Sequence, residues 1–565
     1  MMAFGLVAAA CGNDDDDAAE APDNGVTTTT EAESDTDDVT RGGTLVVGLE
    51  AESNNWLPGK ASLSEAGINV AYSVYDSITA RGADGSVYPF LASSIEPNED
   101  LTEWTVTLRE GIVMHDGTEL DAELMKQIFD EYLIIPEATT AGSLTSVDNV
   151  RVDSEFVYTY ELNETLASFP DLLTGVIGMP FSVEACEARG GRDGDCPDFP
   201  VGTGPFVFVD WVRDGELTLE RNENYWRSDA NGEALPYLDR LVFRPIPDED
   251  SRLNSVAAGT VQVAQTLRQS TVRDARDADG IESYEAIGNN GGGSIFNTNV
   301  APVDDVRVRR GLSHAVNQDD LITVLGGDGI TPPQTQFFSP DSAWYSTDVE
   351  DAYPSYDPEQ AAEYLDEYIN DADRSDGKAV GEPISVEFNC PPDPTLRDLA
   401  QLYQSFWQDA GVEVQLNAVE QAQHIANAVD ADGDPPFSGA YMINCWRMGA
   451  DADPYTTLRG AFDDPPITAT NFTNYTSDRL KDNLEILRTS ADFDERYVAV
   501  EDIGLELAEN VPLIWTGGTA TALMATPQVR NVVGWTIPDQ DGAPSIQGNG
   551  ALGASIRWSE VWLEQ

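Results

Sequence analysis

The chain has 565 residues, with 100 Asp and Glu against 31 Lys and Arg, a formal net charge of −69 and a pI near 4.1. This balance excludes a nucleic-acid-binding protein and disfavours anionic membrane surfaces, because both partners need a basic face. The hydrophobic content of 41% is too high for a disordered acidic polymer, and the length allows two or more domains. The acidity suits a protein that works in salty water and equally one selected only for solubility in a GC-rich genome.

The N-terminus is a short apolar run that ends at a cysteine. Residues 1–11 are too few for a membrane span of about 20 residues, but they are typical of the end of a secretory signal. Ala8-Ala9-Ala10-Cys11 resembles the bacterial lipobox, in which the cysteine is acylated. We therefore predict a lipoprotein signal peptide over residues 1–11, with membrane contact only through a lipid on Cys11. A buried apolar N-terminal strand is the alternative.

The segment after Cys11 is acidic and has no apolar stripe. Positions 14–38 carry eleven acids and no base. Such a stretch buries too little surface to fold, and its charges repel one another. We predict a disordered acidic tether over residues 12–42, which would hold the folded part at the outer face of the cytoplasmic membrane or in a periplasm.

Four further cysteines fit an exported protein, in which an even number favours disulfides. Cys186 and Cys196 bracket a short Gly- and Arg-rich loop, whereas Cys390 and Cys445 each end a strand-like run. We expect two disulfides, one within each of these pairs, with free buried thiols as the alternative. No CxxC or Cys/His cluster occurs, so we predict no metal and no cofactor.

Strand-like and helix-like segments alternate along the chain without an internal repeat. Residues 104–108 alternate as a half-buried strand, and Asp121 is placed to cap a helix that reaches about Tyr132. Asp357-Pro358 has the order of a helix start. Residues 396–406 have helical spacing and are followed by a stop at Gly411 and by a strand over 412–416. The pattern predicts a large mixed α/β protein with two lobes.

The residues do not form a recognisable catalytic site. The sequence has three histidines, no HExxH motif and no GxSxG elbow. His115 belongs to a turn and His314 to an apolar helix, so both are interpreted as structural. We predict that the protein is not an enzyme. A secreted hydrolase of peptides or glycans stays open as an alternative, as does a surface adhesion or chemosensory protein without a role in transport.

One continuous segment resembles a known family. Residues 108–123 read LREGIVMHDGTELDAE, which is similar to the signature of the family 5 extracellular solute-binding proteins. These are the oligopeptide-, dipeptide- and nickel-binding components of ABC importers. The resemblance continues over nearly the whole mature chain, through Gly202-Thr-Gly-Pro-Phe206, Asn222-Glu-Asn-Tyr-Trp226 and Asp453-Pro454.

The resemblance implies a periplasmic-binding-protein-like class II fold, with two mixed-sheet lobes joined by two crossing segments. We place lobe I at residues 43–295 and 513–565, and lobe II at residues 296–512. The implied function is that of a monomeric, lipid-anchored receptor that closes around a solute and delivers it to the permease subunits of an ABC transporter. A peptide is the favoured solute, and oligosaccharide, opine-like and metal-chelate ligands remain open because fold does not fix ligand.

The segment from Trp446 to Pro454 is similar to the ligand loop of the family. In peptide-binding members an Asp of this loop pairs with the α-amine of the peptide, and here Asp451 and Asp453 compete for that role. Arg447 could pair with a ligand carboxylate or with a neighbouring acid, and a solvated acidic loop is the alternative for the whole segment. The predicted ligand-binding residues are Trp446, Arg447, Asp451, Asp453, Asn297, Trp515 and Trp56, of which the last three are placed by position only.

Overall fold

The computed structural model describes residues 39–53, 56–58, 63–82, 85–134, 146–182, 185, 200–340, 342–430, 433–449, 453–463, 470–539 and 556–564. The predicted lipidation site Cys11 and the predicted disulfide partners Cys186 and Cys196 lie outside these residues. Within them, none of the helices has the length and apolar character needed to cross a membrane. The predicted tether ends inside the described part, where the Gly42 N–H already donates to the Tyr237 carbonyl at 2.8 Å.

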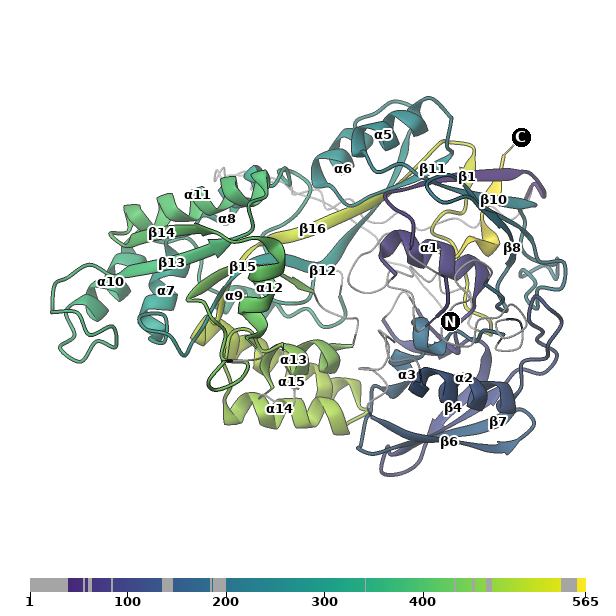
Figure 1. Cartoon of the computed structure of the whole chain (residues 1–565), viewed down its shortest axis with the longest axis horizontal. Coiled ribbons are helices and arrows are strands. Elements are labelled where there is room, and N and C mark those ends of the chain that lie inside the picture. Colours follow the sequence, from purple (N-terminus) through teal and green to yellow (C-terminus); the bar gives the residue numbers. More distant parts are fainter. Residues whose placement is uncertain are drawn as a thin grey trace, which may run out of the picture. The chain divides into compact units, whose positions relative to one another are not determined.

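A mixed sheet of ten strands organises the described chain (Figure 1). β1 pairs in parallel with β10 and β11, and β13 pairs in parallel with β14 and β15, whereas the other neighbours are antiparallel. In spatial order the strands are β14 (Glu413–Ala418), β13 (Ser385–Cys390), β15 (Ile443–Gly449), β12 (Glu282–Phe296), β16 (Leu513–Ala525), β11 (Val263–Thr266), β1 (Thr44–Leu49), β10 (Arg240–Pro245), β9 (Leu217–Arg221) and β8 (Phe206–Trp211).

The two long central strands, β12 and β16, connect the two parts of this sheet. Figure 1 shows β16 running from the neighbourhood of β12 and β15 to that of β11 and β1. The register of β12 against β16 shifts twice, between Gly288 and Gly291 and between Gly292 and Gly293. The boundaries that we predicted between the lobes, at 295/296 and 512/513, fall in β12 and at the start of β16. The division into two lobes stays a prediction.

A second sheet leads directly into the signature segment, which begins at the last residue of β5 and ends in α2. Its four strands follow the order β4 (Ala92–Pro97), β5 (Glu103–Leu108), β7 (Val157–Leu162) and β6 (Val147–Ser154). The predicted strand over 104–108 is confirmed as β5, in which Trp104, Val106 and Leu108 are buried. The predicted helix is α2 (Ala122–Ile134), and the Asp121 carboxylate accepts the Leu124 N–H at 2.7 Å as an N-terminal cap.

The helices that we predicted from caps and spacing are present. Asp357 caps α10 through the N–H groups of Glu359 and Gln360, and Asp393 caps α11 in the same way ahead of Pro394. Gly411, at φ +85°, ends the turn after α11 in the left-handed region that favours glycine. Helices used below are α1 (Glu65–Val74), α6 (Gln269–Arg276), α7 (Val306–His314), α8 (Gln318–Val324), α10 (Pro358–Ile369), α11 (Pro394–Asp409), α12 (Gln421–Val429), α13 (Pro454–Phe462), α14 (Asp478–Thr489) and α15 (Phe493–Asn510).

The signature turn at His115 packs against the turn at Gly202–Gly204. The His115 N–H donates to the Gly202 carbonyl at 2.9 Å, and its Nε2 lies 2.9 Å from the Gly204 carbonyl. A Cβ on Gly202 would lie 2.4 Å from the Tyr75 ring, and one on Gly204 would lie 2.5 Å from the Val74 backbone. Both glycines are therefore required for close packing beneath the end of α1, so the two family motifs stabilise a single junction.

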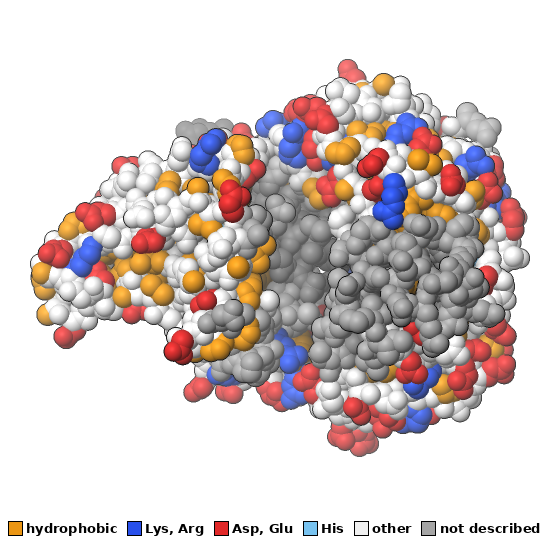
Figure 2. Space-filling model, viewed as in Figure 1, with side chains coloured by type: hydrophobic (Ala, Val, Ile, Leu, Met, Phe, Trp, Pro, Cys, Tyr) orange, Lys and Arg blue, Asp and Glu red, His pale blue; other side chains and the backbone are white. Residues whose placement is uncertain are grey.

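Acidic side chains outnumber basic ones on the face seen in Figure 2. Some of the described arginines contact more than one acid: Arg151, for example, pairs with Glu103, Asp153 and Glu161. Because acids outnumber Lys and Arg by 100 to 31, most acidic side chains have no cationic partner of their own even where an arginine is shared.

Candidate functional site

A cavity of about 550 Å³ opens beyond the carboxyl end of β13, beside the middle of β15. Ligand sites commonly measure about 300–1,000 Å³, so this volume suits a small solute. The described lining comes from both predicted lobes and from both central strands: Leu267, Arg268, Gln269, Gly292, Gly293, Leu325, Pro391, Leu396, Leu399, His424, Ile425, Cys445, Trp446, Thr516, Gly517, Gly518 and Thr519.

The position of the cavity follows from the chain path through β13, α11, β14, α12 and β15. The chain leaves β13 for β14 on one side and then returns past β13 to β15. Because parallel crossovers are right-handed, α11 and α12 lie on opposite faces of the sheet. Such a reversal opens a crevice at the carboxyl edge of the strands, which is where open α/β sheets bind ligands.

The floor of the cavity is largely main chain. A Cβ on Gly292 would lie 3.3 Å from the Thr516 side chain, and one on Gly293 would lie 3.0 Å from the Ile514 carbonyl. Gly517 has φ +154°, and a Cβ there would lie 2.7 Å from Ile322. These glycines allow β12 and β16 to approach closely and leave backbone exposed to the cavity.

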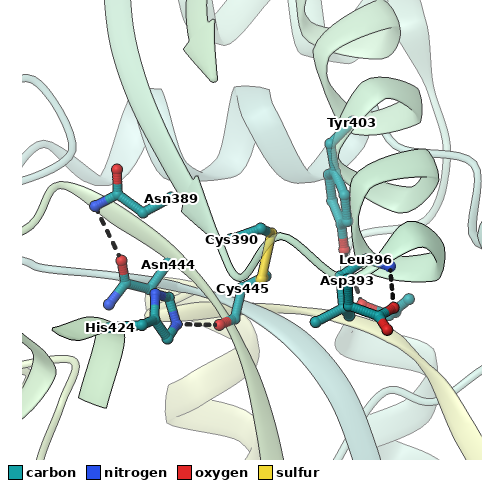
Figure 3. The surroundings of a disulfide bond; sticks show 9 residues. Asn389, Cys390, Asp393, Leu396, Tyr403, His424, Asn444 and Cys445 are labelled. Atoms are coloured by element: carbon teal, nitrogen blue, oxygen red, sulfur yellow. Dashed lines mark hydrogen bonds between the residues drawn. A yellow bond between two sulfur atoms is a disulfide. The ribbon is translucent and has the colours of Figure 1, made fainter. Parts of the chain in front are cut away.

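A disulfide beside the cavity joins the end of β13 to the middle of β15. Cys390, the last residue of β13, is bonded to Cys445 of β15, with the Cα atoms 5.2 Å apart (Figure 3). The residue that follows each cysteine in the chain lines the cavity: Pro391 after Cys390 and Trp446 after Cys445. The covalent link therefore fixes the spacing of two wall residues.

The wall beside α12 is an aromatic pair. The ring of His424 stacks on Trp446 with the centroids 5.5 Å apart, and Trp446 also contacts Phe472 at 4.6 Å. His424 Nε2 lies 3.0 Å from the Cys445 carbonyl, which can only accept, so Nε2 carries the proton (Figure 3). Burial lowers the pKa of His424, and the ring is neutral at pH 7.

Trp446 is the predicted ligand residue that lines this cavity, but its local structure differs from our prediction. The expectation that a loop begins at Trp446 is wrong, because β15 continues from Ile443 to Gly449. The strand continues because Trp446 and Arg447 pair with Gly293 and Gly292, whose missing side chains let the two strands approach. The side chain of Arg447 and the whole of Asp451 lie outside the described residues.

Asp453 lies at the start of α13, where its carboxylate is already engaged. It accepts the Tyr455 N–H at 2.9 Å as a helix cap, and it forms an ion pair with Arg496 at 2.5 Å while only 5% exposed. The structure thus brings Asp453 together with Arg496 rather than with the cavity lining.

The three residues predicted by position are buried away from the cavity. Asn297 uses its Nδ2 to donate to the carbonyls of Ser438, Gly439 and Tyr441. Trp515 packs edge-on against Phe337 at 5.0 Å, although the next residue, Thr516, does line the cavity. Trp56 packs against Trp211 at 5.4 Å.

Several lining residues were not predicted from the sequence. The cap-and-proline pair Asp393-Pro394 after the strand-like run could have located the α11 side of the cavity, since it marks a strand end followed directly by a helix. The lining segment 267–269 had no such signal in the sequence. Its position depends on the pairing of β11 with β16, whose partner residues are about 260 positions apart in the chain. No group of three or more potential metal ligands occurs among the described residues.

Comparison with solved structures shows the same fold. A structure of HbpA2 from Haemophilus parasuis matches with a TM-score of 0.76 and 19% identity, over 93% of this chain and 100% of that one. The fold is therefore that of the class II periplasmic binding proteins, with α/β lobes and a mixed sheet.

Sequence comparison identifies the family. The profile of the bacterial extracellular solute-binding proteins, family 5 (middle part), matches residues 86–466. The chain belongs to this family of extracytoplasmic, non-enzymatic binding proteins. It is 24% identical over 440 residues to di/tripeptide-binding protein 1 of Pseudomonas aeruginosa, with 72% of this chain and 76% of that protein covered. It is 25% identical over 402 residues to the nickel-binding periplasmic protein of Escherichia coli, at 68% and 72% coverage.

Proposed function

We propose that this protein is a lipid-anchored receptor that captures a peptide and delivers it to the permease of an ABC importer. The observation that carries the proposal is the cavity of about 550 Å³, bordered by Trp446 and by the glycine-rich central strands. The glycines of these strands leave room for the backbone of a peptide to lie against the sheet, whatever its side chains are. The similarity to a di/tripeptide-binding protein supports a peptide, and the comparable similarity to a nickel-binding protein makes Ni²⁺ the ligand to test against it.

Within this proposal, Asp451 is the acid that we assign to the α-amine of the peptide. Asp453 is engaged with Arg496 and with the start of α13, so its carboxylate is already neutralised by a cation. Hinge motion would occur at the register shifts of β12 against β16, where glycines tolerate a change in backbone angles. We retain the two lobes at residues 43–295 with 513–565 and at 296–512 as part of the proposal.

Binding is tested on the mature chain purified without denaturation. Mass spectrometry identifies any solute released from it, and calorimetry then measures the affinity for tripeptides, Ni²⁺ and heme. We expect a peptide to bind, and Trp446→Ala to weaken that binding by about 2 kcal/mol, the usual cost of losing a central aromatic contact. The control Trp562→Ala, in a described strand away from the cavity, should leave the affinity unchanged. Binding of Ni²⁺ or heme without any peptide would overturn the peptide assignment.

The anchor is tested separately in a bacterial host. A clickable palmitate analogue should label the full chain, and Cys11→Ala should abolish the labelling and release the protein from the membrane fraction. Labelling that persists in Cys11→Ala would contradict the anchor without affecting the solute assignment.

A further inference from the structure

The lining of the cavity is unusual for so acidic a chain. Acids make up 100 of the 565 residues, yet none of the described lining residues is Asp or Glu. Most of the lining side chains are apolar, and they come from the segments around α6, α8, α11 and α12 and from β15: Leu267, Leu325, Pro391, Leu396, Leu399, Ile425 and Trp446.

The polar side chains of the lining are largely engaged within the protein. Gln269 Nε2 donates to the Gly518 carbonyl at 3.0 Å, and the Thr516 hydroxyl lies 3.1 Å from the Tyr403 hydroxyl. His424 Nε2 is held by the Cys445 carbonyl at 3.0 Å. A ligand would therefore gain few new hydrogen bonds from these side chains and would gain mainly from apolar contact.

The charge of the lining is also balanced. Arg268 is the cation among the described lining residues, and its guanidinium pairs with Asp250 and donates through Nε to the Thr271 hydroxyl at 2.8 Å. Burial keeps His424 neutral at pH 7. A charged ligand side chain placed against these residues would lose hydration without meeting a free opposite charge among them. The α-amine of the peptide is assigned to Asp451, which is not one of these residues.

We propose that this cavity selects solutes that carry a bulky uncharged apolar group, which in a peptide means a Leu, Ile, Met or Phe side chain. The inference rests on the proposed function and specifies its substrate class. The volume exceeds that of one aromatic side chain, so the cavity also holds part of the peptide backbone, which lies along the glycines of β12 and β16.

The test uses the mature chain and a set of tripeptides derived from Ala-Ala-Ala. Each position in turn carries Leu, Phe, Lys or Asp, and calorimetry measures every Kd at pH 7. We expect one position at which Leu or Phe binds about tenfold or more tighter than Lys or Asp, the scale of discrimination that an apolar pocket provides.

A pair of matched variants localises the preference. Ile425 and Ile486 are both solvent-exposed helical isoleucines, 45% and 38% exposed, and of these two Ile425 lines the cavity. Ile425→Asp should weaken the Phe peptide about tenfold and reverse part of the discrimination against Lys, whereas Ile486→Asp should change neither. An equal loss in the two variants would overturn the assignment to this cavity.

The outcomes separate this inference from the function on which it rests. Peptides that bind with equal affinity whatever their side chains would overturn the apolar selection and leave the peptide receptor intact. Failure of every peptide in the set to bind would instead overturn the peptide receptor itself.

Discussion

At the scale of single residues, His115 shows how a family motif serves the fold. Its Nδ1 lies 3.4 Å from the Gly202 N–H, and its Nε2 donates to the Gly204 carbonyl, so the neutral ring satisfies both partners. Burial lowers the pKa of His115 to about 4. A histidine with a lowered folded pKa stabilises the protein above its unfolded pKa of about 6.5, and this contribution is lost as the pH falls from there towards 4.

We therefore expect the free energy of unfolding to fall between pH 7 and pH 5. His115 should account for at most about 2 kcal/mol of this fall, the value that proton linkage gives over this pH range for the change in pKa from about 6.5 to about 4. Urea unfolding of the wild type and of His115→Gln, at both pH values, measures the contribution of His115 to this fall. Glutamine can replace the Nε2 donor but does not titrate, so the free energy of unfolding of His115→Gln should fall less than that of the wild type. His424 contributes equally to both proteins. Identical pH slopes would show that His115 is not the group responsible.

Residue types near the site were easier to predict than their partners. Trp446 was predicted from its residue type and the family pattern, and it does line the cavity. Asp453 could not be assigned in the same way, because its partner Arg496 is 43 residues away and belongs to another helix. The cap at the start of α13 can be predicted from neighbouring residues, whereas the ion pair between distant residues cannot.

At the scale of elements, we expect the disulfide between β13 and β15 to affect both stability and binding. It closes a segment of 55 residues, for which loss of loop-closure entropy from the unfolded chain is worth about 4 kcal/mol. The double variant Cys390→Ala/Cys445→Ala should unfold at lower urea concentration. It should also bind its solute more weakly, since Pro391 and Trp446 lose their fixed spacing.

Reduction supplies the control for this prediction. Dithiothreitol should destabilise the wild type by a similar amount but should affect the double variant less, because the variant has no bond between these strands to reduce. Any residual effect would come from other cysteines. A wild type that keeps its stability and affinity after complete reduction would contradict the role that we assign to the bond.

Helix bounds were predictable from local chemistry, whereas the extent of one strand was not. Asp121, Asp357 and Asp393 mark helix starts through caps that depend only on the next three residues. The continuation of β15 to Gly449 depends on glycines of β12 more than 150 residues earlier in the chain. A sequence read locally cannot show which two strands will pair.

At the scale of the whole molecule, the acidic surface is the feature with a measurable consequence. Subtracting the eleven acids of positions 14–38 from −69 leaves −58 for the rest of the chain. Some of the described arginines are shared among several acids, as Arg307 is among Asp305, Glu367 and Asp371. Salt weakens such surface ion pairs only slightly, by less than about 1 kcal/mol each, whereas it screens the repulsion among all the remaining acids.

Repulsion should therefore dominate, and the free energy of unfolding should rise by about 2 kcal/mol or more between 0.02 and 0.5 M NaCl. Urea titrations at each salt concentration measure the change, and KCl at equal ionic strength should match NaCl if screening is the cause. A variant without residues 12–38 should keep most of the rise, because the folded part retains its own excess of acids. Stability that is unchanged or lowered by salt would mean that the shared ion pairs outweigh the repulsion, and the acidity would then be no adaptation to a saline habitat.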